Sequence, residues 1–70
     1  MNEVGIYLRN ARKARKLSLR GLSELTGISH TEISRIEKGE RETPGPDTLK
    51  KLSVGLSISY EELMHGYGYI

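Results

Sequence analysis

The side chains best suited to chemistry lie in one short segment, residues 29–38, with the sequence SHTEISRIEK. Arg35 can form two parallel hydrogen bonds with O6 and N7 of guanine, and one such pair gives about 1–3 kcal/mol of discrimination between bases. Thr31 can donate to a base edge or place its methyl group against thymine. His30 and Ser34 can bond to bases or to phosphates. These residue types predict recognition of a polar, anionic surface.

The chain lacks the side-chain sets that catalysis or metal binding requires. His30 and His65 lie far apart in the sequence, and neither has carboxylates or cysteines nearby at the spacing of metal ligands. The absence of cysteine excludes disulfides and thiolate metal sites. We therefore expect no enzymatic activity, no bound metal and no cofactor.

Two short helices joined by a glycine turn, within residues 17–40, would position the polar segment. Ser18 is a natural N-cap for the first of these helices. Gly27 suits the left-handed conformation that ends a helix at little cost. Ser29 would cap the second helix, and Glu32 three residues later would complete a capping box. This arrangement is typical of a helix-turn-helix unit.

Such a unit needs apolar anchors on the core and a small residue where its helices cross. Ser23 is the small residue at that position, and Gly39 is a second stop signal for a helix. The side chains predicted to point inward are Leu22, either Leu25 or Thr26, Ile28, Ile33 and Ile36.

A further helix is predicted at the N-terminus, ending near Lys16. Its expected inner face follows a 4,3,4 spacing. The residues of that face are Val4, Leu8, Ala11 and Arg15.

Two more helices are predicted after a loop over residues 40–46, which contains both prolines. Asp47 would cap the first of them, and Ser59 with Glu62 would cap the second. Their expected inner residues are Leu49, Leu52, Leu56 and Leu63. No convincing strand is found, so the pattern predicts an all-α fold, and the final HGYGYI segment has no helical period.

Charge is distributed unevenly along the 70 residues, whose net charge is +2. Residues 1–41 carry nine Lys or Arg against five Glu, a net of +4, whereas residues 42–70 carry a net of −2. An anionic partner would approach the N-terminal half, although a cluster of cations is also typical of a solvated helix face. No apolar run approaches the roughly 18 residues that span a bilayer, and the N-terminus lacks a signal-peptide pattern. We therefore expect a cytoplasmic protein with no membrane contact.

Four segments follow one another in a characteristic order: GIYLRNARKARKLSL, GLSELTGIS, ISRIEKGER and TLKKLSVGLSISYEELM. Together, over about residues 4–65, they resemble the XRE family, which comprises Cro-like and phage-repressor-like helix-turn-helix domains. The resemblance implies a compact five-helix, lambda-repressor-like domain over residues 1–65, with its helix-turn-helix at the second and third helices. The third helix would read the major groove of DNA.

The resemblance also implies roles for individual residues. The implied base readers are His30, Thr31, Ser34 and Arg35. The implied contacts to the DNA backbone are Ser18, Leu19, Arg20, Lys38 and Arg41. Arg12 is expected to form a structural ion pair with Glu37 that pins the first helix to the third.

Two positions depart from the family pattern. The family often has glutamine at the first position of the second helix, where it reaches a phosphate and braces the recognition helix. Leu19 occupies that position here, and Arg20 is the candidate substitute. Gly21 lies inside the same helix, where glycine costs roughly 1 kcal/mol relative to alanine; either a close approach of the DNA backbone or tolerance at an exposed site would explain it.

The function implied by the resemblance is sequence-specific binding of double-stranded DNA by a transcriptional regulator. We expect a repressor that binds a (pseudo)palindromic operator as a homodimer, since a single recognition helix covers only a few base pairs. The alternative is a protein-interaction module, similar to an antitoxin or adaptor, whose main role is partner binding.

The C-terminal stretch is the candidate dimer surface. Its members are Tyr60, Met64, Tyr67, Tyr69 and Ile70. These side chains could instead cover the domain's own core. Residues 66–70 form a tail that either packs or leads toward a second domain, through which a regulatory protein or ligand would act.

Overall fold

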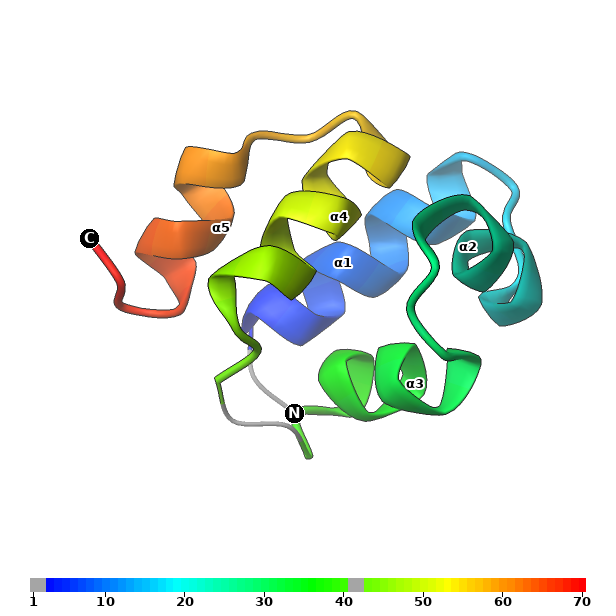
Figure 1. Ribbon diagram of the computed structural model, residues 1–70, viewed down its shortest axis with the longest axis horizontal. Coiled ribbons are helices and arrows are strands. Elements are labelled where there is room, and N and C mark those ends of the chain that lie inside the picture. The colour runs from blue at the N-terminus through cyan, green and yellow to red at the C-terminus, as the bar shows by residue number, and fades with distance from the viewer. Residues whose placement is uncertain (1–2, 41–42) are drawn as a thin grey trace.

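The computed structural model describes residues 3–40 and 43–70, and these residues form five helices without a strand among them. The helices are α1 (Glu3–Ala14), α2 (Leu19–Thr26), α3 (His30–Lys38), α4 (Pro46–Leu56) and α5 (Tyr60–Gly66) (Figure 1). The all-α, five-helix prediction is confirmed. None of the described helices is both long and apolar enough to cross a membrane.

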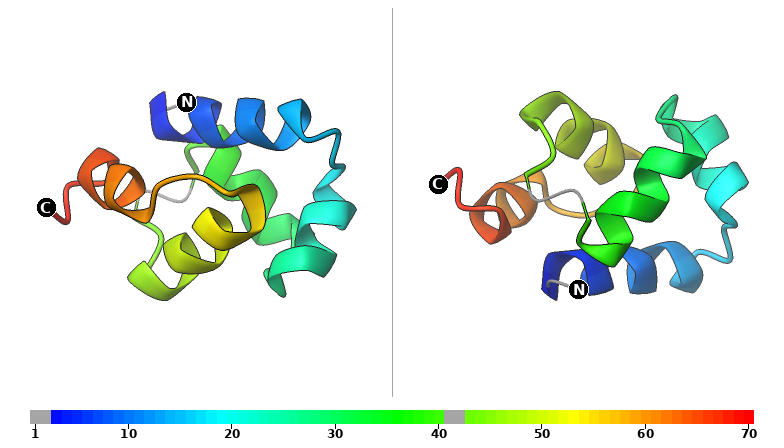
Figure 2. Two further views of the ribbon diagram at one scale, coloured as in Figure 1. Left: turned by 90° about the horizontal axis from the view of Figure 1, so that it is seen from above. Right: turned by 90° about the horizontal axis from the view of Figure 1, so that it is seen from below.

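The helices surround one small core. Seen from below, α3 runs obliquely between α1 and α4, while α2 and α5 lie at opposite ends of the molecule (Figure 2). In tertiary packing, α3 contacts α1 and α2, and α4 contacts α2 and α5. The domain measures 29 × 22 × 20 Å along its principal axes.

Every helix contributes apolar side chains to the core, and each fully buried Leu or Ile contributes about 1.5–3 kcal/mol. The predicted inner residues of α3 and α4 are confirmed as buried, as are those at Leu22, Ile28 and Leu63. Among the described residues, the buried Leu and Ile side chains that form the core are Leu8, Leu22, Ile28, Ile33, Ile36, Leu49, Leu52, Leu56 and Leu63.

Three helices begin with the same local device, a serine whose hydroxyl accepts a hydrogen bond from the backbone N–H three residues later. The O···N distances are 2.9 Å for Ser18, 3.1 Å for Ser29 and 3.1 Å for Ser59. Gly27 and Gly39 end α2 and α3 with φ values of 77° and 78°, in the left-handed region that glycine adopts without a steric penalty. These helix boundaries are confirmed.

The predicted start of α4 is wrong. Gly45 is the N-cap, with no side-chain hydrogen bond, and Pro46 is the first helical residue. Proline suits that position because its fixed φ matches the helix and its missing N–H would lack an intrahelical partner there. Asp47 lies in the first turn, where its charge favours the helix dipole.

The predicted inner face of α1 is wrong at its last turn. Arg15 is exposed, whereas Arg12 is buried. The helix ends at Ala14, two residues before Lys16, which adopts a φ of 58°. Hydrophobic periodicity could not reveal this, because the partner that permits burial of Arg12 lies on α3.

The choice between Leu25 and Thr26 is settled in favour of Thr26. Leu25 is 60% exposed, whereas Thr26 is half-buried. The Thr26 hydroxyl donates to the Leu22 carbonyl at 2.8 Å and accepts from the Ile28 backbone N–H at 3.2 Å. Both polar functions of the threonine are therefore satisfied at the glycine turn.

The C-terminal segment is more helical than predicted, since α5 includes His65 and Gly66. A β-carbon at Gly66 would lie 2.8 Å from Val4 Cγ2, so α5 and α1 approach closely there. After α5, the Tyr69 hydroxyl donates to the Pro44 carbonyl at 2.9 Å. This bond ties the end of the chain to the residues just before α4.

Candidate nucleic-acid interface

The polar segment singled out in the sequence forms α3, and the chain enters it through a three-residue turn, Gly27 to Ser29. Ile28 anchors the turn in the core, while Ile33 and Ile36 do the same for α3. With these side chains inward, the opposite side of α3 is left at the surface (Figure 1).

The structure brings the four predicted base readers together on that surface. His30, Thr31 and Arg35 are exposed, and Ser34 is half-buried. They lie on successive turns of one helix, so their side chains cover a strip along its outer face. The strip offers a guanidinium, an imidazole and two hydroxyl groups, which can donate to the acceptors on base edges.

A buried ion pair holds this helix against α1, as the resemblance implied. Arg12 Nε donates to Glu37 Oε2 at 2.7 Å, and Arg12 Nη2 donates to Oε1 at 3.1 Å. Arg12 Nη1 also donates to the Leu17 carbonyl at 2.8 Å. The fork geometry and the third bond satisfy both partners, which burial of two charges requires.

The predicted backbone contacts flank the base-reading strip at both ends of the helix-turn-helix. Ser18 and Arg20 are exposed at the start of α2, and Leu19 between them is half-buried. Lys38 is exposed at the end of α3. Arg41 lies outside the described residues.

Gly21, in the first turn of α2, has close neighbours within its own chain. A β-carbon there would lie 3.3 Å from Ser18 Oγ and 3.4 Å from Leu17 Cδ2. The first distance is tighter than an ordinary van der Waals contact. A local packing reason for this glycine therefore exists without any approach by DNA.

Sequence reasoning missed a hollow beside this surface. It has a volume of about 130 Å³ and is lined by Arg9, Arg12, Leu19, Glu37 and Lys38. Arg9 was not among the predicted contacts. The available signal was its position three residues before Arg12, which places both on one side of α1.

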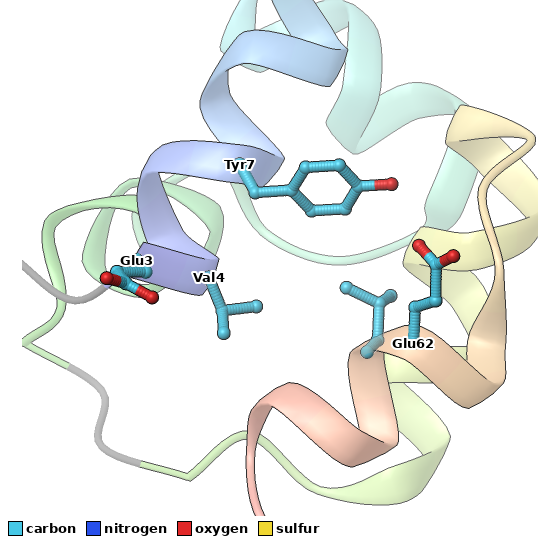
Figure 3. Close-up of a pocket in the computed structure, with 5 residues that line it drawn as sticks. Glu3, Val4, Tyr7 and Glu62 are labelled. Carbon is cyan, nitrogen blue, oxygen red and sulfur yellow. The ribbon is translucent and has the colours of Figure 1, made fainter.

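Larger hollows lie elsewhere on the described part of the chain. One, of about 230 Å³, lies between α1 and α5, with Tyr7 and Glu62 on opposite sides (Figure 3). The other, also of about 230 Å³, lies between α2 and α4 and includes Leu25 and Val54. No group of three His, Cys, Asp or Glu suited to a metal ion occurs within residues 3–40 and 43–70.

Comparison with known proteins gives a consistent result. A family model described as a helix-turn-helix domain matches residues 5–69. Two relatives from Bacillus subtilis strain 168, the HTH-type transcriptional repressor RghR and the uncharacterized HTH-type transcriptional regulator RghRB, are each 47% identical over all 70 residues. The match covers 52% of RghR and 50% of RghRB, so the chain spans about half the length of these relatives.

A more distant relative is the HTH-type transcriptional regulator SlrR of the same strain. It is 33% identical over 60 residues, which are 86% of this chain and 40% of that protein. No solved structure gives a significant match to the chain.

Proposed function

This chain belongs to the helix-turn-helix domain family of transcriptional regulators, and on that premise we propose that it recognises a specific site on double-stranded DNA through α3. The observation that carries the proposal is the outer face of α3. It exposes hydrogen-bonding side chains on a helix that is capped by Ser29 and held by Arg12 and the core. A helix presented in this way fits the major groove.

Within this interface we assign base reading to the four residues of the strip. Arg35 is the strongest candidate for sequence discrimination, because its guanidinium can bond to guanine at two atoms. His30, Thr31 and Ser34 contribute further contacts at neighbouring base pairs. Lys38 and the start of α2, with Ser18, Leu19 and Arg20, contact the sugar-phosphate backbone, as does Arg41.

The dimensions of the domain support binding as a dimer. Two half-sites on one face of the duplex lie about 34 Å apart, whereas the longest extent of this domain is 29 Å. One domain therefore cannot place recognition elements in both half-sites, and a pseudo-palindromic operator requires two copies. Tyr69 and Ile70 are 38% and 68% exposed and remain the candidate contacts between copies.

The other members of that candidate surface are more engaged with their own domain. Tyr60, Met64 and Tyr67 are partly buried and pack against the core. Lys50 Nζ also lies 5.0 Å from the centroid of the Tyr60 ring. Their role in a dimer interface is therefore secondary to that of the last two residues.

Repression by occupying an operator is the proposed regulatory outcome, in line with the name of RghR. The relatives reported above are bacterial. Because bacterial DNA lies in the cytoplasm, the proposed function implies a cytoplasmic location for this chain.

The experiment that tests the proposal is selection of bound duplexes from a random pool, followed by affinity measurements with two variants. Arg35→Ala should weaken binding to the selected site and relax preference at one base position, by about 1–3 kcal/mol. Lys38→Ala should weaken binding to all duplexes similarly and reduce the salt dependence. Absence of binding to any duplex would refute the proposal, and identical behaviour of both variants would refute the division of roles.

A partner-binding role is the second candidate, and one surface favours it. Leu25 and Val54 are 60% and 69% exposed and line one hollow together with Lys50 and Lys51. Neighbouring exposed apolar side chains often mark interaction sites. Retention of partner binding by a variant that no longer binds DNA would support this second function.

A further inference from the structure

The hollow beside the base-reading strip brings together cations from separate helices. Arg9 comes from α1 and Lys38 from the last position of α3, while Leu19 contributes the wall at the first position of α2. Arg12 and Glu37 complete the lining. The surface is thus formed by three segments that meet only in the folded domain.

The charges in this hollow do not cancel. Among residues 3–40 and 43–70, Glu37 is the only acidic residue that lines the hollow, and each of its carboxylate oxygens accepts a hydrogen bond from Arg12. That pair is neutral as a unit. Within residues 3–40 and 43–70, neither Arg9 nor Lys38 forms an ion pair with a carboxylate, so the hollow carries two uncompensated positive charges.

The chemistry of the lining selects an oxyanion. The planar guanidinium of Arg9 matches a tetrahedral anion with two parallel N–H donors, and Lys38 adds a mobile point charge. Leu19 is apolar, so it offers no side-chain hydrogen bond to the anion. Recognition must therefore come from the flanking cations, which replace the glutamine expected at the Leu19 position.

We propose that this hollow seats one phosphate of the DNA backbone between Arg9 and Lys38, an inference that rests on the proposed DNA-binding function. The location supports this, because the hollow borders the end of α3 and the start of α2, which flank the base-reading strip. The Arg12–Glu37 pair is its fixed wall and sets the spacing between α1 and α3. Arg9 thus becomes a DNA contact contributed from outside the helix-turn-helix.

The test compares wild type with Arg9→Gln, Arg9→Lys and a matched control, Lys51→Gln, on a mixed-sequence duplex. Lys51→Gln removes one positive charge, as Arg9→Gln does, so both variants change the net charge equally. Lys51 is exposed on α4 and lines a different hollow. Affinity is measured over a range of KCl concentrations, and the slope of log affinity against log salt is determined. Circular dichroism melts establish that each variant is folded.

Each neutralised phosphate contributes about 0.9 to the magnitude of that slope. Because Lys38 stays beside the same phosphate, Arg9→Gln should lower the slope by up to about 0.9 per bound chain. An ion pair contributes little at about 1 M salt, so this loss corresponds to binding up to about eightfold weaker at about 0.1 M. Arg9→Lys should keep the wild-type slope. Lys51→Gln should stay within about twofold of wild type.

Three outcomes would overturn the inference. Equal slopes for Arg9→Gln and Lys51→Gln would remove Arg9 from the interface while leaving DNA binding intact. If the slopes are equal and inorganic phosphate raises the melting temperature of wild type but not of Arg9→Gln, the hollow takes free phosphate instead of DNA. Absence of duplex binding by wild type would overturn this inference together with the proposed function.

Discussion

Replacement of Arg12 by methionine should destabilise the domain far more than any substitution of an exposed cation. Methionine keeps much of the side-chain length but removes the guanidinium. Glu37, only 5% exposed, would then lose the donors to both carboxylate oxygens, and the Leu17 carbonyl would lose its bond at 2.8 Å. A carboxylate stranded in this way cannot recover its hydration without opening the contact between α1 and α3.

The expected loss is about 3–5 kcal/mol, the usual cost of removing one partner of a buried pair. A chain of 70 residues has a total stability of about 3.5–10 kcal/mol at the usual contribution per residue. Arg12→Met therefore brings the domain close to unfolding at room temperature. The melting temperature should fall by at least about 12 °C, since each kcal/mol shifts a domain of this size by about 4–8 °C.

The assay is urea unfolding followed by far-ultraviolet circular dichroism, with Lys13→Met as the matched control. Lys13 is exposed beside Arg12 in α1, and its loss should change the free energy of unfolding by less than about 0.5 kcal/mol. Because Arg12→Met could fail to fold, the double variant Arg12→Met/Glu37→Met is measured as well. It should recover most of the loss, because apolar side chains can replace a buried ion pair at little cost.

Two results would refute this reasoning. Equal destabilisation by Arg12→Met and Lys13→Met would mean that the pair contributes as little as a surface charge. A double variant no more stable than Arg12→Met would mean that removing the stranded carboxylate restores nothing, so the two side chains are not energetically coupled.

Two further variants, Tyr67→Phe and Gly55→Ala, test a buried hydroxyl group and a close helix contact. The Tyr67 hydroxyl is buried without a hydrogen-bond partner in the described part of the chain, and burial raises the pKa of Tyr67. The unfolded chain therefore loses this proton first as the pH rises above the ordinary value of about 10, and stability falls from there through the folded pKa. Tyr67→Phe should be at least as stable as wild type in urea titrations near neutral pH and lose stability less steeply in alkali; an unchanged alkaline slope would contradict this. Gly55→Ala should lower the free energy of unfolding by about 1–3 kcal/mol, and with it the melting temperature. The reason is that its β-carbon would lie 2.7 Å from Thr26 Cγ2, and two hydrogen bonds hold the Thr26 side chain in place. The control Gly45→Ser, where a β-carbon meets nothing within 4 Å, should be neutral or slightly stabilising, and equal losses from both would refute the steric explanation.

The parts of the fold that sequence alone predicted are those encoded by local contacts. The starts of three helices could be predicted because each capping hydrogen bond joins a serine hydroxyl to a backbone N–H only three residues later. These serines are Ser18, Ser29 and Ser59. Ile33 and Ile36 were assigned to the core because one helix face repeats with a short period. The exposed side of α3 follows from them, so the candidate base readers could be named without coordinates.

The parts that sequence could not predict depend on distant partners or on competition between local signals. Arg12 is buried because Glu37, 25 positions away, accepts hydrogen bonds at both carboxylate oxygens. No local pattern contains that information, and only the family resemblance suggested it. Asp47 is a good capping residue by type, yet the N-cap is Gly45 and the helix begins at Pro46, two positions before the start that a cap at Asp47 predicts. The proposed phosphate contact of Arg9 could not be predicted either, because it depends on a hollow that forms only when three segments have come together.

The cap at Ser29 fixes the rotational register of α3 as well as its starting point. Each residue of an α-helix turns the direction of its side chain by about 100°. A start one position earlier would therefore place Arg35 in the buried position of Ile36, and a start one position later would place Ile36 in the exposed position of Arg35. With the register held by the cap and by the buried isoleucines, the outward positions can change with little effect on folding, because exposed substitutions usually alter stability by less than about 0.5 kcal/mol. If the proposed function holds, sequence preference and fold are encoded in separate residues of one nine-residue helix, and new operators could be reached by exchanging the outer side chains alone.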